Sequence, residues 1–438
     1  MKVLATKYKD AHTDGSVEKY RLRYPEREGL TLIETKITQS RSDIEDNFYE
    51  RISPDNGRTW SDWQVTRQRK DDKNYQGNHQ LAYIEDVPVW NPVHKHYVTF
   101  GRQLLWLDGY ESATKRFWAG DTLGRLIHTF LTVYDDQKHY GTELIRIEEG
   151  DDFDPENWAN PGYTNTNYVY ELGNTIVEPN GDILFTAEIL MRTACKLTGR
   201  DIMEVFPSAP NAVNAVVVFR GKWNGQRYLL TPGQPIVISD RLSSRGLNEP
   251  AMAKLSSGRI VVILRGSNAK MSWPQRMDPG TPNFKWFSYS DDGGKTFSDP
   301  MPWRFDDGEV IYSSATLSQI FQDPRTGKHY WIGTVTDHTA YANFPRYPLN
   351  IVELDETYGT AKKATLTVID TRRENEPKWI QLSNFNLIQD RETGHLILTL
   401  TKVGQFQTGE SAPEGNPFHA EVWRYTIELD GSPLSPHS

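Results

Sequence analysis

The feature that most constrains this chain is a hairpin pattern that recurs along it. Each copy is a short apolar segment, a turn containing Gly or Asp and Pro, and a second, more hydrophobic segment. Clear copies cover residues 174–190, 248–265, 314–336 and 383–402, and two looser copies cover 23–41 and 79–102. The six copies begin about 55 to 95 residues apart, and antiparallel units that recur at such spacings are typical of the blades of a β-propeller.

Little else in the sequence competes with this interpretation. Few segments longer than about ten residues have apolar residues at a period of 3.6, so we expect little helix. We therefore predict an all-β fold, a six-bladed β-propeller of four-stranded antiparallel blades, that forms a single domain over residues 1–438. The segment 107–163 is too long for one connection between blades, and we expect it to hold extra strands or long loops over one face.

Composition excludes several functional classes. The formal net charge is −9, from 49 basic and 58 acidic residues, and no block of like charges occurs; this disfavours nucleic acid as a partner. The one cysteine, Cys195, excludes an internal disulfide and any zinc site built from several thiolates. No Walker-type loop, no GxGxxG that opens a helix and no HExxH motif occurs, and we expect neither a cofactor nor a metal.

Targeting segments are also missing from the sequence as given. No run of 18 apolar residues occurs, so we expect no membrane partner. The first residues have no apolar core typical of a signal peptide. We expect a cytoplasmic protein, or a secreted one if a leader has been removed.

Two short turns share the pattern Ser-x-Asp-x-Gly-x-Thr-aromatic. They are residues 53–60 (SPDNGRTW) and 290–297 (SDDGGKTF). In such a turn the aspartate accepts backbone N–H bonds, a glycine supplies a positive φ, and the aromatic ring packs between strands. The pattern resembles the Asp-box of the sialidase superfamily of β-propellers. In that family the box lies on outer hairpins away from the active face, which implies a structural role for Asp55 and Asp292.

Polar residues recur where the first strand of a predicted hairpin begins and where the second strand ends. In a propeller blade both positions lie near the axis at the same end, and polar groups that converge in a concave cavity are typical of a binding site. The residues in these positions are Arg23, Arg41, His79, Arg102, Asn174, Glu188, Glu249, Arg265, Tyr312, Asp337, Asn384 and Lys402.

The resemblance to sialidases extends to individual residues of the first hairpin. Arg23-Tyr24-Pro25 matches the Arg-x-Pro with which the family's first hairpin begins, and Arg41 matches the arginine at its end. The family's acid/base aspartate follows in a loop, and both Asp43 and Asp46 fall near that place, with Asp46 preferred.

The central element of the family is also matched. In NEPAMAKLSSGRIVVILR, Glu249 begins a hairpin that ends in Arg265, and Arg346 matches the third arginine of the family's triad. The resemblance implies that Arg23, Arg265 and Arg346 clamp a substrate carboxylate, through charge-assisted hydrogen bonds worth about 1.5–3 kcal/mol each. Such a clamp suits a terminal sialic acid, another nonulosonic acid or a uronic acid.

The family's tyrosine nucleophile has no counterpart at its expected position. There the chain reads Ser383-Asn384-Phe385, while Tyr312, Tyr341 and Tyr347 are candidates for neighbouring positions. Either another residue attacks the sugar, or water does so with Glu249 or an aspartate as base, or the substrate is not a sialic acid.

The hypothesis that follows is an exo-acting, sialidase-like glycoside hydrolase that removes an acidic terminal sugar from an oligosaccharide or glycoconjugate. It assigns the general acid to Asp46 or Asp43, base or nucleophile support to Glu249, and a catalytic position to Tyr312. Substrate binding falls to Arg23, Arg41, Arg265, Arg346 and His79.

Two alternatives remain open at this point. A polysaccharide lyase acting on uronate-containing glycan needs a base for the proton beside the carboxylate, and His79, His128 and His338 are candidates. In that case Arg102 or Arg23 would neutralise the carboxylate next to His79. The second alternative is a propeller that binds glycan without converting it.

Overall fold

Short antiparallel strands follow one another along almost the whole chain. The computed structural model describes residues 1–12, 17–39, 45–68, 73–75, 79–118, 125–148, 154, 160–209, 213–406 and 420–429. In these residues the strands form six antiparallel sheets, and the predicted six-bladed β-propeller is confirmed. No helix in the described ranges is long and apolar enough to cross a membrane.

Blades 1 to 3 come from the first half of the chain. Blade 1 contains β2 (Val17–Arg23), β3 (Leu32–Gln39), β4 (Asn47–Ser53) and β5 (Gln64–Gln68). Blade 2 is larger, with β6 (Lys73–Tyr75), β7 (His79–Glu85), β8 (Val89–Asn91), β9 (His96–Trp106), β10 (Arg125–Tyr134) and β11 (His139–Leu144). Blade 3 contains β12 (Val169–Val177), β13 (Ile183–Leu190), β14 (Asn214–Trp223) and β15 (Tyr228–Pro232).

The second half of the chain supplies the other blades. Blade 4 contains β16 (Asn248–Lys254), β17 (Ile260–Arg265), β18 (Lys285–Ser290) and β19 (Met301–Pro302). Blade 5 contains β20 (Gln319–Gln322), β21 (His329–Thr334), β22 (Leu349–Glu353) and β23 (Thr367–Asp370). Blade 6 contains β24 (Phe385–Gln389), β25 (Leu396–Thr401), β26 (Val422–Glu428) and, from the N-terminus, β1 (Lys2–Lys9).

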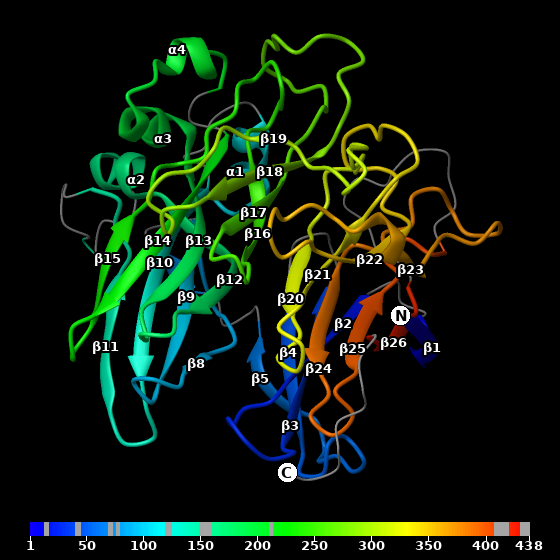
Figure 1. The fold of residues 1–438 in the computed structure, drawn as a ribbon. Helices are drawn as coiled ribbons and strands as arrows, with labels where there is room; N and C mark the ends of the chain where they lie inside the picture. The colour runs from blue at the N-terminus through cyan, green and yellow to red at the C-terminus, as the bar shows by residue number, and fades with distance from the viewer. Residues whose placement is uncertain are drawn as a thin grey trace.

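The few helices lie in connections between strands. They are α1 (Tyr110–Trp118), α2 (Pro161–Asn167), α3 (Met191–Thr198), α4 (Ile202–Val205) and the short 3₁₀ helix η3 (Lys363–Thr365). The segment 107–163, expected to be an insertion, thus includes α1 and two strands of blade 2, β10 and β11. Figure 1 shows α2, α3 and α4 gathered at one end of blade 3.

The ring is closed by the two ends of the chain. Strand β1 pairs antiparallel with β26, with Lys2 opposite Glu428 and Ala5 opposite Tyr425. Figure 1 shows the N-terminal strand in blue beside the red C-terminal strand. The repeat pattern did not reveal this pairing, because β1 is a single strand without its own hairpin.

The blades have a common orientation that defines two faces. First strands of neighbouring blades contact each other, β12 with β16, β16 with β20 and β24 with β2, so they line the centre. We call the end at which β16 begins and β17 ends the Glu249 face. The opposite end carries the turns between the first and second strands, and we call it the turn face.

The hydrogen bonds predicted for the two Asp-box-like turns are present. Asp55 accepts the Thr59 backbone N–H at 2.7 Å and the Ser53 hydroxyl at 2.8 Å. Asp292 accepts the Thr296 backbone N–H at 3.0 Å in the same way. Both turns join the third and fourth strands of a blade, blade 1 and blade 4, and both lie on the turn face.

These bonds make the turns sensitive to acid. The Thr59 N–H and hydroxyl lower the pKa of Asp55 to about 2, and the corresponding bonds lower the pKa of Asp292. Since each folded-state pKa lies below the unfolded value, the stabilisation is complete above about pH 4 and is lost as the pH falls towards 2. The double variant Asp55→Asn, Asp292→Asn should therefore show a shallower loss of stability in this window, measured by urea unfolding.

The control for this prediction is Asp62→Asn, an exposed aspartate just beyond the first turn. It should follow the wild type at each pH. If the double variant also follows the wild type, the two turns do not contribute to acid sensitivity.

Candidate active site

The hairpin of β16 and β17 brings Glu249 and Arg265 together at the Glu249 face. Asn248 pairs with Arg265 across the two strands, and the register shifts at the following residues. Arg265 Nη1 donates to Glu249 Oε1 at 2.6 Å. Glu249 has a φ of 44°, a left-handed conformation that is uncommon for a residue with a side chain. The predicted pair of Glu249 and Arg265 thus forms within a single hairpin.

Arg346 reaches the same place from the connection between β21 and β22 in blade 5. Asn343 links the two arginines: its side-chain oxygen accepts from Arg265 Nη2 at 3.2 Å, and its backbone carbonyl accepts from Arg346 Nε at 3.2 Å. Arg346 Nη1 also donates to Gln381 Oε1 at 2.8 Å. The structure therefore holds two of the three predicted clamp arginines around one asparagine.

A third cation at this place, Lys285, was not recognised in the sequence. It begins β18 directly opposite Arg265, and its side chain is fully buried. Its ammonium group donates to the Thr316 carbonyl. Burial lowers the pKa of Lys285 to about 7, although the carboxylate of Glu249 opposes this shift. A lysine within a strand carries no motif, so only its position in the folded blade identifies it.

Two carboxyl groups lie side by side here with opposite pKa shifts. Glu188 of β13 accepts the Glu249 backbone N–H at 2.8 Å and is 3 % exposed. Burial raises the pKa of Glu188, and the carboxylate of Glu249 adds to this effect. Burial would also raise the pKa of Glu249, but Arg265, Lys285 and Arg346 lower it below its ordinary value. Neighbouring acids with pKa values shifted apart are typical of sites that separate acid and base roles.

The second oxygen of Glu249 is a further distinguishing feature. Oε2 is buried, and within the described part of the chain it has no hydrogen-bond partner. Buried polar atoms are nearly always paired, so an unpaired carboxylate oxygen next to three cations marks a position for a ligand or a water molecule.

The structure corrects the predicted place of Arg23. The first strand of blade 1 is Val17–Arg23, so Arg23 ends this strand instead of preceding it. The following turn packs against the β24–β25 turn, where Arg391 donates to the Glu26 carbonyl at 2.6 Å. Arg23 therefore lies on the turn face, and its partner is Glu50, at 3.3 Å. The reason is that Pro25, which lacks a backbone N–H, lies in the turn. The strand with alternating apolar residues therefore precedes Pro25.

Several other predicted residues are placed only in part. Arg41 and Asp43 lie outside the described residues, and of His79 only the backbone, at the start of β7, is described. Asp46 directly precedes β4, and its backbone N–H donates to the Thr38 carbonyl at 2.8 Å. Since the β3–β4 connection corresponds to the end of β17 in blade 4, Asp46 lies at the Glu249 face.

The tyrosine candidates divide between exposed and packed positions. The ring of Tyr312 stacks on that of Phe284, the residue before Lys285, with centroids 5.5 Å apart. Tyr341 is 62 % exposed and accepts the Lys270 backbone N–H at 3.0 Å. Tyr347 packs against the core between blades 5 and 6.

The other members of the predicted polar ring are not all at the rim. Arg102 lies within β9, which continues to Trp106, and it forms an ion pair with Asp86. Lys402 is buried 2.6 Å from Asp370, an ion pair at the end of blade 6. Arg102 thus lies inside its strand, whereas Lys402, which directly follows β25, lies at the Glu249 face, where it is buried in an ion pair.

Two of the three histidine candidates of the lyase hypothesis have described side chains. His128 is 1 % exposed in β10, where its ring packs 5.5 Å from that of Tyr163 in α2. His338 is exposed in the connection that follows β21. The remaining candidate, His79, is the one whose side chain is not described.

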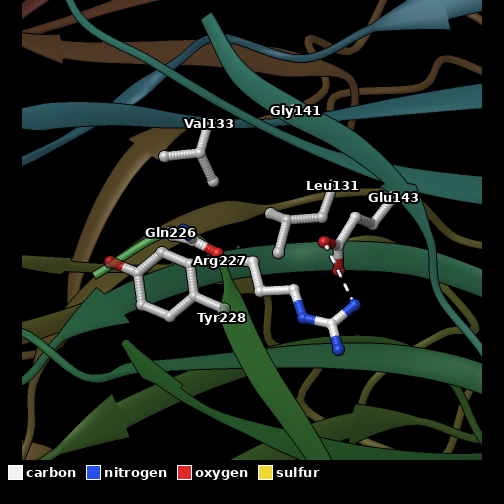
Figure 2. A pocket seen from close by; sticks show the side chains of 7 residues that line it. All are labelled: Leu131, Val133, Gly141, Glu143, Gln226, Arg227 and Tyr228. Carbon is white, nitrogen blue, oxygen red and sulfur yellow. Dashed lines mark ion pairs between the residues drawn. The ribbon is translucent and has the colours of Figure 1, made fainter. Parts of the chain in front are cut away.

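A small pocket on the outer strands is unrelated to this site. Figure 2 shows the residues around it, from β10, β11, the β14–β15 turn and the start of β15, with Arg227 and Glu143 paired at 3.6 Å. Its volume is about 10 Å³, which suffices for about one water molecule.

Known structures share the fold. A protein of unknown function from Dyadobacter fermentans matches with a TM-score of 0.52 and 13% identity, over 97% of this chain and 99% of that chain. A variant of the NanB sialidase from Streptococcus pneumoniae matches with a TM-score of 0.51 and 11% identity, over 97% of this chain and 68% of that chain. Comparison with family profiles and with curated protein sequences gives no match. The fold is that of a sialidase-like β-propeller.

The lowered pKa of Lys285 predicts that the stability of the protein depends on pH. Its pKa of about 7 in the folded protein lies below its ordinary value of 10.5, so between these values the unfolded chain binds more protons. The contribution of Lys285 to the free energy of unfolding therefore rises as the pH increases from about 7 to 10.5. The Lys285→Met variant should lack this rise, measured as urea midpoints at several pH values from neutral to alkaline.

Lys254→Met is the matched control, because Lys254 lies at the other end of the same blade and pairs with Glu178. It should retain the rise that the wild type shows. A Lys285→Met variant with the wild-type slope would show that Lys285 does not lose its proton near neutral pH.

Proposed function

We propose that this protein is an exo-acting glycoside hydrolase for glycans that end in a carboxylate-bearing sugar. The observation that carries the proposal is the convergence of Arg265, Arg346 and Lys285 on the partly buried Glu249. One carboxylate does not balance the two guanidiniums, and Lys285, with a pKa of about 7, adds positive charge at and below neutral pH, so the site attracts a second anion. A sugar carboxylate is an anion that guanidinium groups bind through paired, charge-assisted hydrogen bonds.

Arginine is suited to this recognition. Its planar guanidinium carries five N–H donors and binds carboxylates through paired hydrogen bonds. The described contacts of Arg265 use its two terminal nitrogens, one for Glu249 and one for Asn343. Each terminal nitrogen carries a second N–H, so the guanidinium has donors left for a substrate. Asn343 fixes Arg265 and Arg346 relative to each other before the substrate arrives.

The acid role of Asp46 follows from the resemblance to sialidases and from its place at the Glu249 face, and the base role of Glu249 follows from its negative charge. Asp46 gives a proton to the glycosidic oxygen, the bond from the anomeric carbon to that oxygen breaks, and positive charge develops on the sugar ring. A water molecule attacks the anomeric carbon and passes a proton to the anionic Glu249. Glu188, whose raised pKa favours the protonated form, keeps the backbone of Glu249 in place through the bond to its N–H. Tyr312 remains a candidate nucleophile for a two-step variant of this reaction.

The direct test is incubation with oligosaccharides that end in sialic acid, another nonulosonic acid or a uronic acid, with neutral-ended chains as controls. We expect mass spectrometry to detect a released acidic sugar with one water added and no change in the neutral controls. Detection of an unsaturated product that absorbs ultraviolet light would show that the protein is a lyase and not a hydrolase. Tight binding without a product would identify a binding protein.

Substitutions at the site should separate catalysis from folding. Glu249→Gln preserves the shape of the side chain but removes its charge, and we expect turnover to fall by about 10²–10⁴-fold. Arg265→Ala should abolish turnover, because it removes the cation that holds both Glu249 and the substrate. Initial rates with the released-sugar assay would measure both effects, and circular dichroism would verify the fold.

Arg259→Ala is the matched control for Arg265→Ala. Arg259 lies at the other end of the same hairpin and pairs with the exposed Asp291 at 2.7 Å. Its loss should leave turnover unchanged. Wild-type rates in the Glu249→Gln or Arg265→Ala variants would exclude this site.

A further inference from the structure

A second pocket lies on the turn face, away from Glu249. It lies where the β2–β3 turn of blade 1, strands β8 and β9 of blade 2 and the β24–β25 turn of blade 6 meet. Its volume is about 550 Å³, within the ~300–1,000 Å³ typical of small-molecule pockets. The hydrolase proposed above makes no use of this pocket.

One wall of the pocket is a row of aromatic rings on three neighbouring strands. Trp90 of β8 is paired with Tyr97 of β9, and Tyr97 is paired with Tyr134 of β10. The rings of Trp90 and Tyr97 meet edge to face at 4.8 Å, and those of Tyr97 and Tyr134 stack at 5.4 Å. All three are only partly buried, so the row presents apolar ring surface to the pocket.

Three arginines also line the pocket: Arg23, Arg27 and Arg391, together with the carboxylate of Glu26. Two carboxylates that do not line the pocket pair with two of these arginines, Glu50 with Arg23 at 3.3 Å and Glu28 with Arg27 at 3.8 Å. Arg27 is 56% exposed, and its guanidinium lies 5.8 Å from the centre of the Trp90 ring.

These arginines are positioned and retain hydrogen-bonding capacity. Arg391 is fixed by the Gly29 and Glu26 carbonyls at 2.9 and 2.6 Å, and its guanidinium lies 4.1 Å from the centre of the Tyr24 ring. Arg23 donates one hydrogen bond among the described residues, to the Glu50 carboxylate. Since each guanidinium has five N–H donors, both have more donors than these bonds use.

We propose that this pocket binds a carboxylate-bearing sugar unit of a glycan, separately from the Glu249 site. The apolar C–H face of the sugar ring packs on the aromatic row, while the arginines bind its carboxylate. The choice of a sugar rests on the proposed function, whereas the charge and the aromatic surface do not. A nucleotide is less suitable, because among the described residues that line the pocket there is no Asn or Gln side chain to read a base.

The test is isothermal titration calorimetry with D-glucuronic acid at millimolar concentrations, with D-glucose as the matched neutral probe. We expect the wild type to bind glucuronic acid and not glucose. Arg27→Glu and Trp90→Ala should each weaken one binding component by about tenfold or more. Arg58→Glu is the control, because Arg58 lies on the same face but pairs with Glu392 outside the pocket.

The Arg346→Ala variant distinguishes binding at the turn-face pocket from binding at the Glu249 site of the proposed hydrolase. Binding that persists in Arg346→Ala and Arg58→Glu but is lost in Arg27→Glu and Trp90→Ala supports the turn-face pocket, whether or not the protein has hydrolase activity. Binding that is lost only in Arg346→Ala overturns the pocket and leaves the Glu249 site in place. Absence of binding, equal binding of glucose, or tighter binding of adenosine monophosphate than of glucuronic acid overturns the proposed ligand.

Discussion

The structure depends on closure of the ring between blades 1 and 6. Strands from the two ends of the chain, β1 and β26, pair in the last blade. The seam beside them contains Glu34 of β3, which is fully buried. It accepts from Tyr8 of β1 at 2.9 Å and from Arg51 of β4 at 2.7 Å, and it pairs with Arg424 of β26. A buried carboxylate is tolerated only when it is paired, so this cluster fixes the seam in one arrangement.

Closure matters for function because the candidate site combines residues from several blades. Glu249, Arg265 and Lys285 belong to blade 4, Arg346 to blade 5 and Glu188 to blade 3. Once the ring is closed, the packing of the three blades holds these side chains at fixed distances. The excess of positive charge around Glu249 is a property of this assembly, since no single strand contains it.

The two faces of the propeller differ in their chemistry. On the Glu249 face, buried cations and two carboxyl groups with opposite pKa shifts suit bond cleavage. On the turn face, aromatic rings and partly exposed arginines suit reversible binding. With both proposals, one face would convert an acidic glycan end while the other holds a further acidic unit.

Local sequence patterns determined the repeating hairpins, the six blades, the two Asp-box-like turns and the Glu249–Arg265 pair. Each depends on residues close together in the chain, where strand alternation and turn chemistry are readable. Only the tertiary structure decided that Arg23 lies on the turn face, that Lys285 supplies a third cation and that β1 completes blade 6. The physical reason is that a hairpin pattern does not define where its first strand begins. Because the first strand of blade 1 begins earlier than predicted, Arg23 lies at the opposite end of this blade. Contacts between blades join residues far apart in the sequence, so no local pattern predicts them.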